Sequence, residues 1–382
     1  MKRITGTYAI STTLGESVRA FVPHALPPSD PELSPAVYEE LNRQAELALA
    51  RLAGVSGLVP SVDWLLYSAI RKEALLTSQI EGTQATLIDL FEEEAGFKVS
   101  NTEDVEEVTN YLCAFRWVQE QLRSSQGLPI SVRLLREAHR LLLSGARGAS
   151  KQPGELRQSQ NWIGGTRPGN AVFVPPPPER VAELLADLER FIHDPNTTLP
   201  PLVRVALIHA QFETIHPFLD GNGRIGRLLI AALFEQWGVL SEPLLYLSGY
   251  LKQHQLEYYR LLSVIRTEGD WEAWIMFFLE GVATAAADAE KNIIAVASLV
   301  AADRRRLLQS PNAGPASYRL FELLPMMPRF TIERVRQQLD TSFPTATAAV
   351  RALEELGIVV EVTGQKKNRS YSYQAYVDLL SR

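Results

Sequence analysis

The run HPFLDGNGRIGR, from His216 to Arg227, constrains the fold more than any other part of this chain. Ahead of it, apolar residues recur at spacings of three and four, which is the pattern of one face of an α-helix. These residues are Leu202, Val205, Ile208, Phe212 and Ile215. The helix has to end near His216, because Pro217 disfavours helical geometry in the residue before it. Residues 225–237 are apolar almost all round and Gly238 follows them, which predicts a second helix buried in a core.

The turn between the two helices carries residue types that suit a phosphate-bearing ligand. Free main-chain N–H groups and the positive dipole end of the second helix form an anion site. Gly221 and Gly223 allow the backbone to approach a phosphate closely. Arg224 and Arg227 lie three residues apart on one helical face, so both guanidinium groups can reach the same polyphosphate.

Two further side chains complete the predicted chemistry. Asp220 offers a hard oxygen ligand for Mg²⁺, an ion that takes only one or two carboxylates beside phosphates. His216 suits a general base at neutral pH, since the usual pKa of histidine is about 6.5. GNGRIG also matches the GxGxxG pattern of dinucleotide-binding folds, but it follows a helix where that pattern requires a strand. His209, in the preceding helix, is expected to be structural. The sequence therefore predicts nucleotide phosphate chemistry.

The run resembles the signature of the Fic domain family, HxFx(D/E)GNGRxxR, at every constrained position. Members of this family typically transfer AMP from ATP to a hydroxyl of a protein side chain. The resemblance implies that His216 deprotonates the target hydroxyl, that Asp220 holds Mg²⁺ against the α- and β-phosphates, and that Phe218 anchors the loop. It also implies an ATP-binding set made of Gly221, Asn222, Gly223, Arg224, Ile225, Gly226 and Arg227, with Arg224 toward the β-phosphate and Arg227 at the γ-phosphate.

A second motif, TSQIEG, closes a helix expected over residues 62–81, and Gly82 supplies its stop. Thr77 and Glu81 lie four residues apart on one face. A carboxylate in the last turn faces the negative end of the helix dipole, so a cation is expected nearby. The string resembles the inhibitory motif (S/T)xxxE(G/N) of Fic proteins, which implies that Glu81 pairs with Arg227 and leaves ATP in an unproductive pose. The alternative is a solvated helix end.

The flanking segments give weaker signals. Residues 1–35 contain Pro23, Pro27, Pro28 and Pro31 and are expected to form an extended arm with little structure. Helices are expected at 36–53 and 130–144, and His139 in the latter is interpreted as packing. Cys113 lies in a helical pattern and is expected in the core.

Residues 153–178 predict a hairpin around a turn at Pro168 and Gly169. The resemblance implies a flap that holds the target backbone by strand addition, formed by Ile163, Gly164, Gly165, Val172, Phe173 and Val174. A plain surface hairpin is the alternative. Residues 243–262 are expected to be helical, followed by a helix at 271–279 and an alanine-rich helix that reaches about Gln309. Tyr250 and Tyr259 are candidates to stack on adenine, with packing between helices as the alternative.

After a linker at 310–317, helices are expected at 318–324, 331–339 and 344–356, and a strand pair at 358–362 and 371–376. This order predicts a winged helix. Its candidate duplex contacts are Thr345, Thr347, Arg351, Lys366, Lys367 and Arg369. Glu354, Glu355 and Glu361 reduce the net positive charge of this region, so a protein-docking or dimerising module is an equal alternative.

The predicted fold is mainly α, a Fic-type helical bundle with a β-hairpin flap and a C-terminal winged helix. Its parts are a helical region with the inhibitory helix (1–125), the catalytic core with the following helices (126–309) and the winged helix (318–382). A net charge of −6 argues against a surface that binds nucleic acid throughout. One cysteine excludes an internal disulfide, and the absence of a long apolar run predicts a cytoplasmic protein without a membrane span.

The predicted function is a protein adenylyltransferase that uses ATP and Mg²⁺ and modifies a Ser, Thr or Tyr hydroxyl of a target protein, self-modification included. A homodimer is left open. Three alternatives remain: a kinase-like member, disfavoured because Gly223 and Arg227 are both present; removal of AMP from a target; and a transcriptional regulator that only senses ATP.

Overall fold

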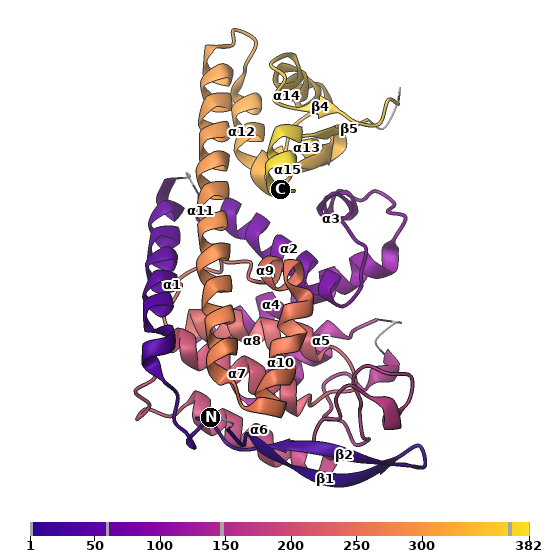
Figure 1. The fold of residues 1–382 in the computed structure, drawn as a ribbon. Helices are drawn as coiled ribbons and strands as arrows, with labels where there is room; N and C mark the ends of the chain where they lie inside the picture. Colours follow the sequence, from indigo (N-terminus) through magenta and orange to yellow (C-terminus); the bar gives the residue numbers. More distant parts are fainter. Residues whose placement is uncertain (1–2, 59–60, 146–148, 366–368, 382) are drawn as a thin grey trace.

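The computed structural model describes residues 3–58, 61–145, 149–365 and 369–381 and is mainly helical, as the sequence predicts (Figure 1). The helices are α1 (Pro35–Val55), α2 (Val62–Ile80), α3 (Leu87–Glu94), α4 (Thr102–Arg123), α5 (Val132–Leu142), α6 (Pro178–Ile192), α7 (Pro201–Ile215), α8 (Asn222–Gln236), α9 (Ser248–Gln253), α10 (Gln255–Glu268), α11 (Trp271–Gln309), α12 (Pro315–Leu323), α13 (Ile332–Leu339), α14 (Phe343–Glu355) and α15 (Gln374–Leu380). Short 3₁₀ turns are η1 (Ser56–Leu58), η2 (Ala149–Lys151), η3 (Pro168–Asn170) and η4 (Leu324–Met326). The strands are β1 (Gly6–Thr13), β2 (Glu16–Pro23), β3 (Arg329–Thr331), β4 (Val360–Glu361) and β5 (Ser370–Ser372).

Helices α7 and α8 form the centre of the molecule. Nearly every residue of α7 is buried, and α8 is buried along most of its length. α4 and α5 pack on one side of this pair, and α11 packs on α7 from another. α1 lies along the lower half of α11, so the N-terminal region and the long helix share one face (Figure 1). A single hydrophobic cluster runs from α1 to α15, so the three predicted parts share one core.

Local capping explains where the helices that frame the site begin. α2 starts after Ser61, whose hydroxyl accepts a hydrogen bond from the main-chain N–H of Asp63. α5 starts in the same way after Ser131, which accepts from Leu134. α7 has Pro201 in its first turn, where no intrahelical donor is needed.

The N-terminal arm is a correction to the sequence prediction. Residues 6–23 form an antiparallel hairpin, in register from Gly6 opposite Pro23 to Thr13 opposite Glu16. Its two-residue turn, Leu14 and Gly15, has positive φ at both positions, which matches the twist of the strands. The prolines that suggested an unstructured arm begin only at the end of β2. The hairpin lies across the base of the molecule in Figure 1, below α6 and α10.

The structure differs from the prediction at three further places. Residues 244–247, expected to be helical, precede α9 without helical structure. The two helices expected after residue 271 are one continuous helix, α11. Cys113, expected in the core, is exposed on α4.

The C-terminal part contains helices α12 to α14 and a three-stranded sheet in the order β3-β5-β4. The strand expected to reach Tyr376 ends at Ser372, and α15 begins two residues later. β3 was not expected. Lys366 and Lys367 lie outside the described residues, and Arg351 pairs with Glu355 at 3.0 Å. The assignment of this part as a winged helix stays a prediction.

Among the described residues, no helix has the length and apolar character needed to span a lipid bilayer.

Candidate active site

The loop between α7 and α8 is fixed by hydrogen bonds to its own backbone. Asn222 closes it, because its amide oxygen accepts from the Phe218 N–H at 2.8 Å and its amide nitrogen donates to the Phe218 carbonyl at 2.9 Å. Phe218 is 1% exposed and therefore lies in the core, as expected. His216 ends α7 in the left-handed region, with φ of +50°. The predicted helix, turn and helix are all present.

His139 supports the same loop from α5. Its ring stacks on Phe218 with 3.9 Å between ring centroids, and Nε2 donates to the Asp220 carbonyl at 3.0 Å. Nδ1 accepts from the Gly154 N–H at 2.8 Å, so only the neutral ring satisfies both contacts. Burial lowers the pKa of His139 to about 4. The packing role predicted for His139 is therefore joined by a role in holding the loop.

Arg157 was missed by the sequence analysis and holds the loop from the other side. It is 2% exposed, and its guanidinium donates to the carbonyls of His216 at 2.8 Å and Pro176 at 2.6 Å, with longer bonds to Ile215 and Ser159. Burial lowers its pKa to about 10, so it stays charged at neutral pH. No periodicity in the sequence marks this residue, since its partners are all main-chain atoms.

His216, the predicted base, is neutral at physiological pH. Burial, and then the positive charge of Arg157, lower its pKa to about 4. Glu213 lies one helical turn earlier and is buried, and its Oε1 lies close to Gly226 of α8. Burial raises the pKa of Glu213 to about 7, although Arg227 opposes the shift. A neutral imidazole is the form that can accept a proton.

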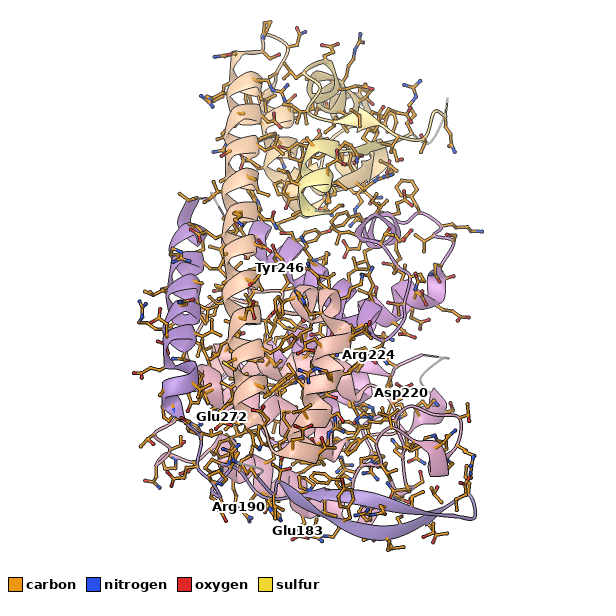
Figure 2. All side chains as sticks on the ribbon, viewed as in Figure 1. Glu183, Arg190, Asp220, Arg224, Tyr246 and Glu272 are labelled. Carbon is orange, nitrogen blue, oxygen red and sulfur yellow. The ribbon has the colours of Figure 1, made fainter. Side chains whose placement is uncertain are left out.

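The start of α8 brings together the residues of the predicted anion site. Gly221 precedes it with φ of +74°. Arg224 lies beside Asp220 (Figure 2), with 3.6 Å between Nη2 and Oδ1. Its Nη1 donates to Glu107 Oε2 at 3.1 Å. Asp220, Arg224 and Glu107 line a polar cavity of about 300 Å³, which Glu81 and Lys151 also face. In the described chain no group of three or more His, Cys, Asp or Glu side chains is arranged to hold a metal.

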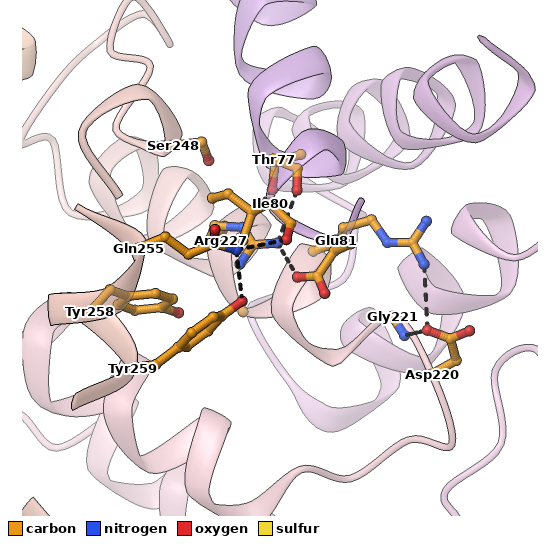
Figure 3. A network of polar contacts seen from close by, with 12 residues as sticks. Thr77, Ile80, Glu81, Asp220, Gly221, Arg227, Ser248, Gln255, Tyr258 and Tyr259 are labelled. Atoms are coloured by element: carbon orange, nitrogen blue, oxygen red, sulfur yellow. Dashed lines mark hydrogen bonds and ion pairs between the residues drawn. The ribbon is translucent and has the colours of Figure 1, made fainter. Parts of the chain in front are cut away.

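Glu81, at the end of α2, contacts Arg227, which is the pairing that the resemblance implied, and Thr77 contacts the same guanidinium, which was not predicted (Figure 3). Glu81 Oε1 lies 2.5 Å from Arg227 Nη2, and Thr77 accepts from Arg227 through Oγ1 at 2.6 Å and through its carbonyl at 3.1 Å. Burial alone would raise the pKa of Glu81, but Arg227 outweighs it and holds that pKa below its usual value. Gly223 lies directly beneath, where a Cβ atom would come within 2.3 Å of Glu81 Oε1. The pair therefore fills the space over the glycine turn.

Two residues behind Arg227 form a buried hydrogen-bonded pair. His209 Nε2 lies 2.8 Å from the Tyr258 hydroxyl, and its Nδ1 lies 3.2 Å from the Gly226 carbonyl. Because a carbonyl can only accept, Nδ1 carries the proton and Tyr258 donates to Nε2. Burial lowers the pKa of His209 to about 3, which agrees with a structural, neutral ring. Tyr258 was not singled out from the sequence.

The two predicted adenine-stacking tyrosines lie in different surroundings. Tyr250 is buried, and its ring packs against His254 at 4.4 Å and Phe277 at 5.3 Å between centroids. Tyr259 is 45% exposed, and its hydroxyl accepts from Gln255 at 3.4 Å. Gln255 also donates to the Ile80 carbonyl at 3.0 Å, which places Tyr259 beside the end of α2 (Figure 3).

The predicted flap is shorter than the sequence suggests. Instead of two strands, one bridge joins Ile163 to Phe173, with Ile163 N–H donating to the Phe173 carbonyl at 2.8 Å. Gly164 and Gly165 both have positive φ, and η3 contains the predicted turn. Val172 is 77% exposed, whereas Val174 is buried under β2 and accepts from the Phe21 N–H at 2.9 Å. The N-terminal hairpin therefore supports the flap.

Comparisons with known proteins agree with this geometry. The model of the Fic/DOC family N-terminal region matches residues 39–120, and that of the Fic/DOC family matches residues 129–234. The protein adenylyltransferase Fic of Drosophila yakuba is 29% identical over 205 residues, which cover 53% of this chain and 38% of the relative. Protein adenylyltransferase fic-1 of Caenorhabditis briggsae is 33% identical over 133 residues, which cover 35% of this chain and 24% of the relative. The match thus spans well under half the length of these relatives.

Two solved structures share the fold. A Fic family protein from Desulfovibrio desulfuricans G20 aligns with a TM-score of 0.57 at 22% identity, over 89% of this chain and 96% of that one. Residues 134–508 of Fic-1 from Caenorhabditis elegans align with a TM-score of 0.51 at 24% identity, over 68% of this chain and 72% of that one. With the whole signature folded into one site and both family models matched in order along the sequence, this chain belongs to the Fic/DOC family.

Proposed function

We propose that this chain is a protein adenylyltransferase that transfers AMP from ATP to a side-chain hydroxyl of a target protein and is held inactive by Glu81. The observation that carries this proposal is the meeting of Glu81 with Arg227 over the glycine turn, 2.5 Å apart, beside a neutral His216. The names of the Drosophila and Caenorhabditis relatives support the same reaction.

In the proposed reaction the target oxygen attacks the α-phosphorus of ATP in line with the departing pyrophosphate. His216 accepts the hydroxyl proton as the new P–O bond forms and the bond to the β-phosphate bridging oxygen breaks. The N–H groups at the start of α8, with Arg224 and Arg227, stabilise the negative charge on the triphosphate. Asp220 would hold Mg²⁺, whose chemistry here is to neutralise the phosphates. Its exposed carboxylate beside Arg224 fits a metal that takes most other ligands from phosphate and water.

Inhibition follows from competition for one guanidinium. A γ-phosphate bound to Arg227 would need the N–H donor that Glu81 occupies, and it would need the space above Gly223. With Glu81 in place, ATP can only bind with its triphosphate displaced from the attack geometry. Thr77 holds the same edge of the guanidinium, because it accepts from Nε and from the Nη2 that Glu81 also contacts.

The target is proposed to bind along the flap, where Ile163 to Gly165 and the exposed Val172 offer main-chain groups beside the loop. Tyr259, on α10 beside the end of α2, is the better placed of the two tyrosines for contact with a nucleotide, whereas Tyr250 is buried and packs against aromatic rings. Self-modification, a cytoplasmic location, a homodimer and DNA or protein contact through the C-terminal part remain parts of the proposal.

The test is incubation of purified protein with ATP labelled at the α-phosphate. Label on protein should rise in Glu81→Gly and disappear in Glu81→Gly combined with His216→Ala. ATP labelled at the γ-phosphate serves as the control and should leave no label, which separates this reaction from phosphoryl transfer. Absence of α-label in Glu81→Gly, together with nanomolar DNA binding, would favour the ATP-sensing regulator and refute the transferase.

A further inference from the structure

Both arginines of the signature are held by carboxylates from the N-terminal region. Glu81, at the end of α2, holds Arg227, and Glu107, in the second turn of α4, holds Arg224 with 3.1 Å between Oε2 and Nη1. Both side chains are almost fully buried: Arg224 is 5% exposed and Arg227 is 2% exposed. Only the first of these contacts is part of a recognisable sequence motif.

Two of the three nitrogen atoms of the Arg224 guanidinium point at carboxylates. Its Nη1 is taken by Glu107, its Nη2 faces Asp220 at 3.6 Å, and its Nε is buried without a hydrogen-bond partner among the described residues. A phosphate that approached Arg224 would need the N–H groups that now point at carboxylates. Two anions then compete for one planar set of donors.

Glu107 is placed beside Arg224 by a helix that is packed against several others. Val105 and Val108 on either side of it are buried, and α4 packs on α2, α5 and α8. Glu103 and Glu106 line the same cavity from the same helix. No hydrogen bond or ion pair joins either of them to Arg224 in the described chain, so the contact with Glu107 is specific rather than a general effect of acidic surroundings.

We propose that Glu107 is a second inhibitory residue, which occupies Arg224 in the way that Glu81 occupies Arg227. This inference rests on the proposed function and extends it: the N-terminal region restrains both phosphate-binding arginines, from two different helices. A change at Glu81 then frees only one of them. Full nucleotide affinity requires that both carboxylates leave.

The experiment measures the Kd of Mg²⁺-ATP by calorimetry in the full chain and in Glu81→Gly, Glu107→Gln and the double variant. Glu107→Gln should tighten ATP binding about tenfold in the presence and in the absence of Glu81, because the gain comes from a charged hydrogen bond that no longer has to be broken. Incorporation of α-label should stay low in Glu107→Gln alone, since Glu81 still holds Arg227, and should be highest in the double variant.

Two controls make the result specific. Glu103→Gln removes the same charge from the same cavity without touching Arg224 and should change the Kd by less than about threefold. Glu107→Asp keeps the charge but withdraws it from Arg224, so it should resemble Glu107→Gln. It also guards against a glutamine variant that is poorly folded, which thermal unfolding would reveal.

Weaker or unchanged ATP binding in both Glu107 variants would overturn this inference, as would an equal gain from Glu103→Gln. If Glu81→Gly itself binds and transfers AMP, the proposed function survives that failure. If none of the proteins binds ATP, the proposed function and this inference fall together.

Discussion

Arg157→Met is the sharpest test of how the loop around His216 is built. The guanidinium of Arg157 reaches main-chain carbonyls and has no carboxylate partner among the described residues, so its removal tests hydrogen bonding to the loop backbone rather than an ion pair. The two short bonds, to the carbonyls of His216 and Pro176, satisfy acceptors in a buried region. Leaving each without a donor costs about 1–2 kcal/mol, so the expected loss of unfolding free energy is about 2–4 kcal/mol.

The same substitution should change the acid chemistry of the site. The charge of Arg157 is the second cause, after burial, of the low pKa of His216, which lies at about 4. Without it the pKa of His216 should rise toward its usual value, although burial keeps it depressed. Histidine proton signals followed by NMR across pH 3 to 8 measure this directly.

Urea unfolding gives the free energy, and the Tm should fall by roughly 4–8 °C, since 1 kcal/mol shifts a large domain by about 2 °C. Arg180→Met is the matched control, because the Arg180 side chain is 43% exposed and pairs with Glu183 three residues away. It should cost less than about 0.5 kcal/mol. A loss from Arg157→Met no greater than that of the control, or a His216 pKa that does not move, would refute this account of the loop.

Three further outcomes follow from buried polar groups. The imidazoles with lowered pKa values are His139, His209 and His216. Below pH 6.5 these three rings bind protons in the unfolded chain but not in the folded one, whereas Glu213, with its pKa raised to about 7, is protonated in the folded chain and acts in the opposite sense. The free energy of unfolding, measured with urea, should therefore fall by about 2.7 kcal/mol as the pH drops from 6 to 5, because the unfolded chain binds a net of about two more protons. A free energy that does not change over this range would contradict the buried, neutral rings. Tyr258→Phe leaves Nε2 of His209 without its donor and should cost about 1–2 kcal/mol by the same assay, and no loss would mean that water replaces the hydroxyl. Gly223→Ala should displace the Glu81 carboxylate yet give no α-label on protein, because the added methyl group also fills the phosphate turn. Gly54→Ala, in open space on α1, is the control and should leave the free energy of unfolding unchanged or raise it. Strong labelling by Gly223→Ala would show that the turn tolerates a side chain.

Much of the site was predictable because its residues are local in sequence. A proline after His216 ends one helix, and glycines before Arg224 start the next, so the loop and both arginines follow from neighbouring residues. The pair between Glu81 and Arg227 joins residues far apart in the chain, but each belongs to a short motif with its own recognisable spacing. The residues alone predicted a cation near Glu81, and the resemblance to Fic proteins named Arg227 as that cation.

The parts that could not be predicted depend on tertiary contacts or on main-chain atoms. Arg157 binds carbonyls, which every residue carries, so nothing in the sequence points to its partners. The helix expected at 271–279 and the alanine-rich helix expected after it are one helix, α11, and Gly281 lies inside it, where the ring of Tyr250 packs against it and a Cβ atom would come within 2.7 Å. That glycine makes room for an aromatic ring rather than ending the helix.

The strand predicted up to Tyr376 fails for a similar reason. The Tyr373 hydroxyl donates to Asp303 of α11 at 2.7 Å, and the rings of Tyr373 and Tyr376 stack at 5.4 Å between centroids. These contacts with the long helix favour α15 over a longer strand. The N-terminal hairpin was missed because its turn places Leu14 at positive φ. This conformation is uncommon for leucine, so the residue does not indicate a turn in the sequence.

The burial of the two arginines also explains why inhibition and nucleotide binding should be linked. A buried guanidinium that loses its carboxylate without a replacement is costly, commonly by 3–5 kcal/mol. Arg227, at 2% side-chain exposure, therefore does not release Glu81 into solvent at little cost; the pair opens most readily when another anion takes the vacated N–H group. A triphosphate is the anion that the proposed site would supply. On this argument the inhibitory glutamate and the γ-phosphate are alternative partners of one buried charge, and whatever relieves inhibition has to shift the balance between those two anions rather than simply expose the arginine.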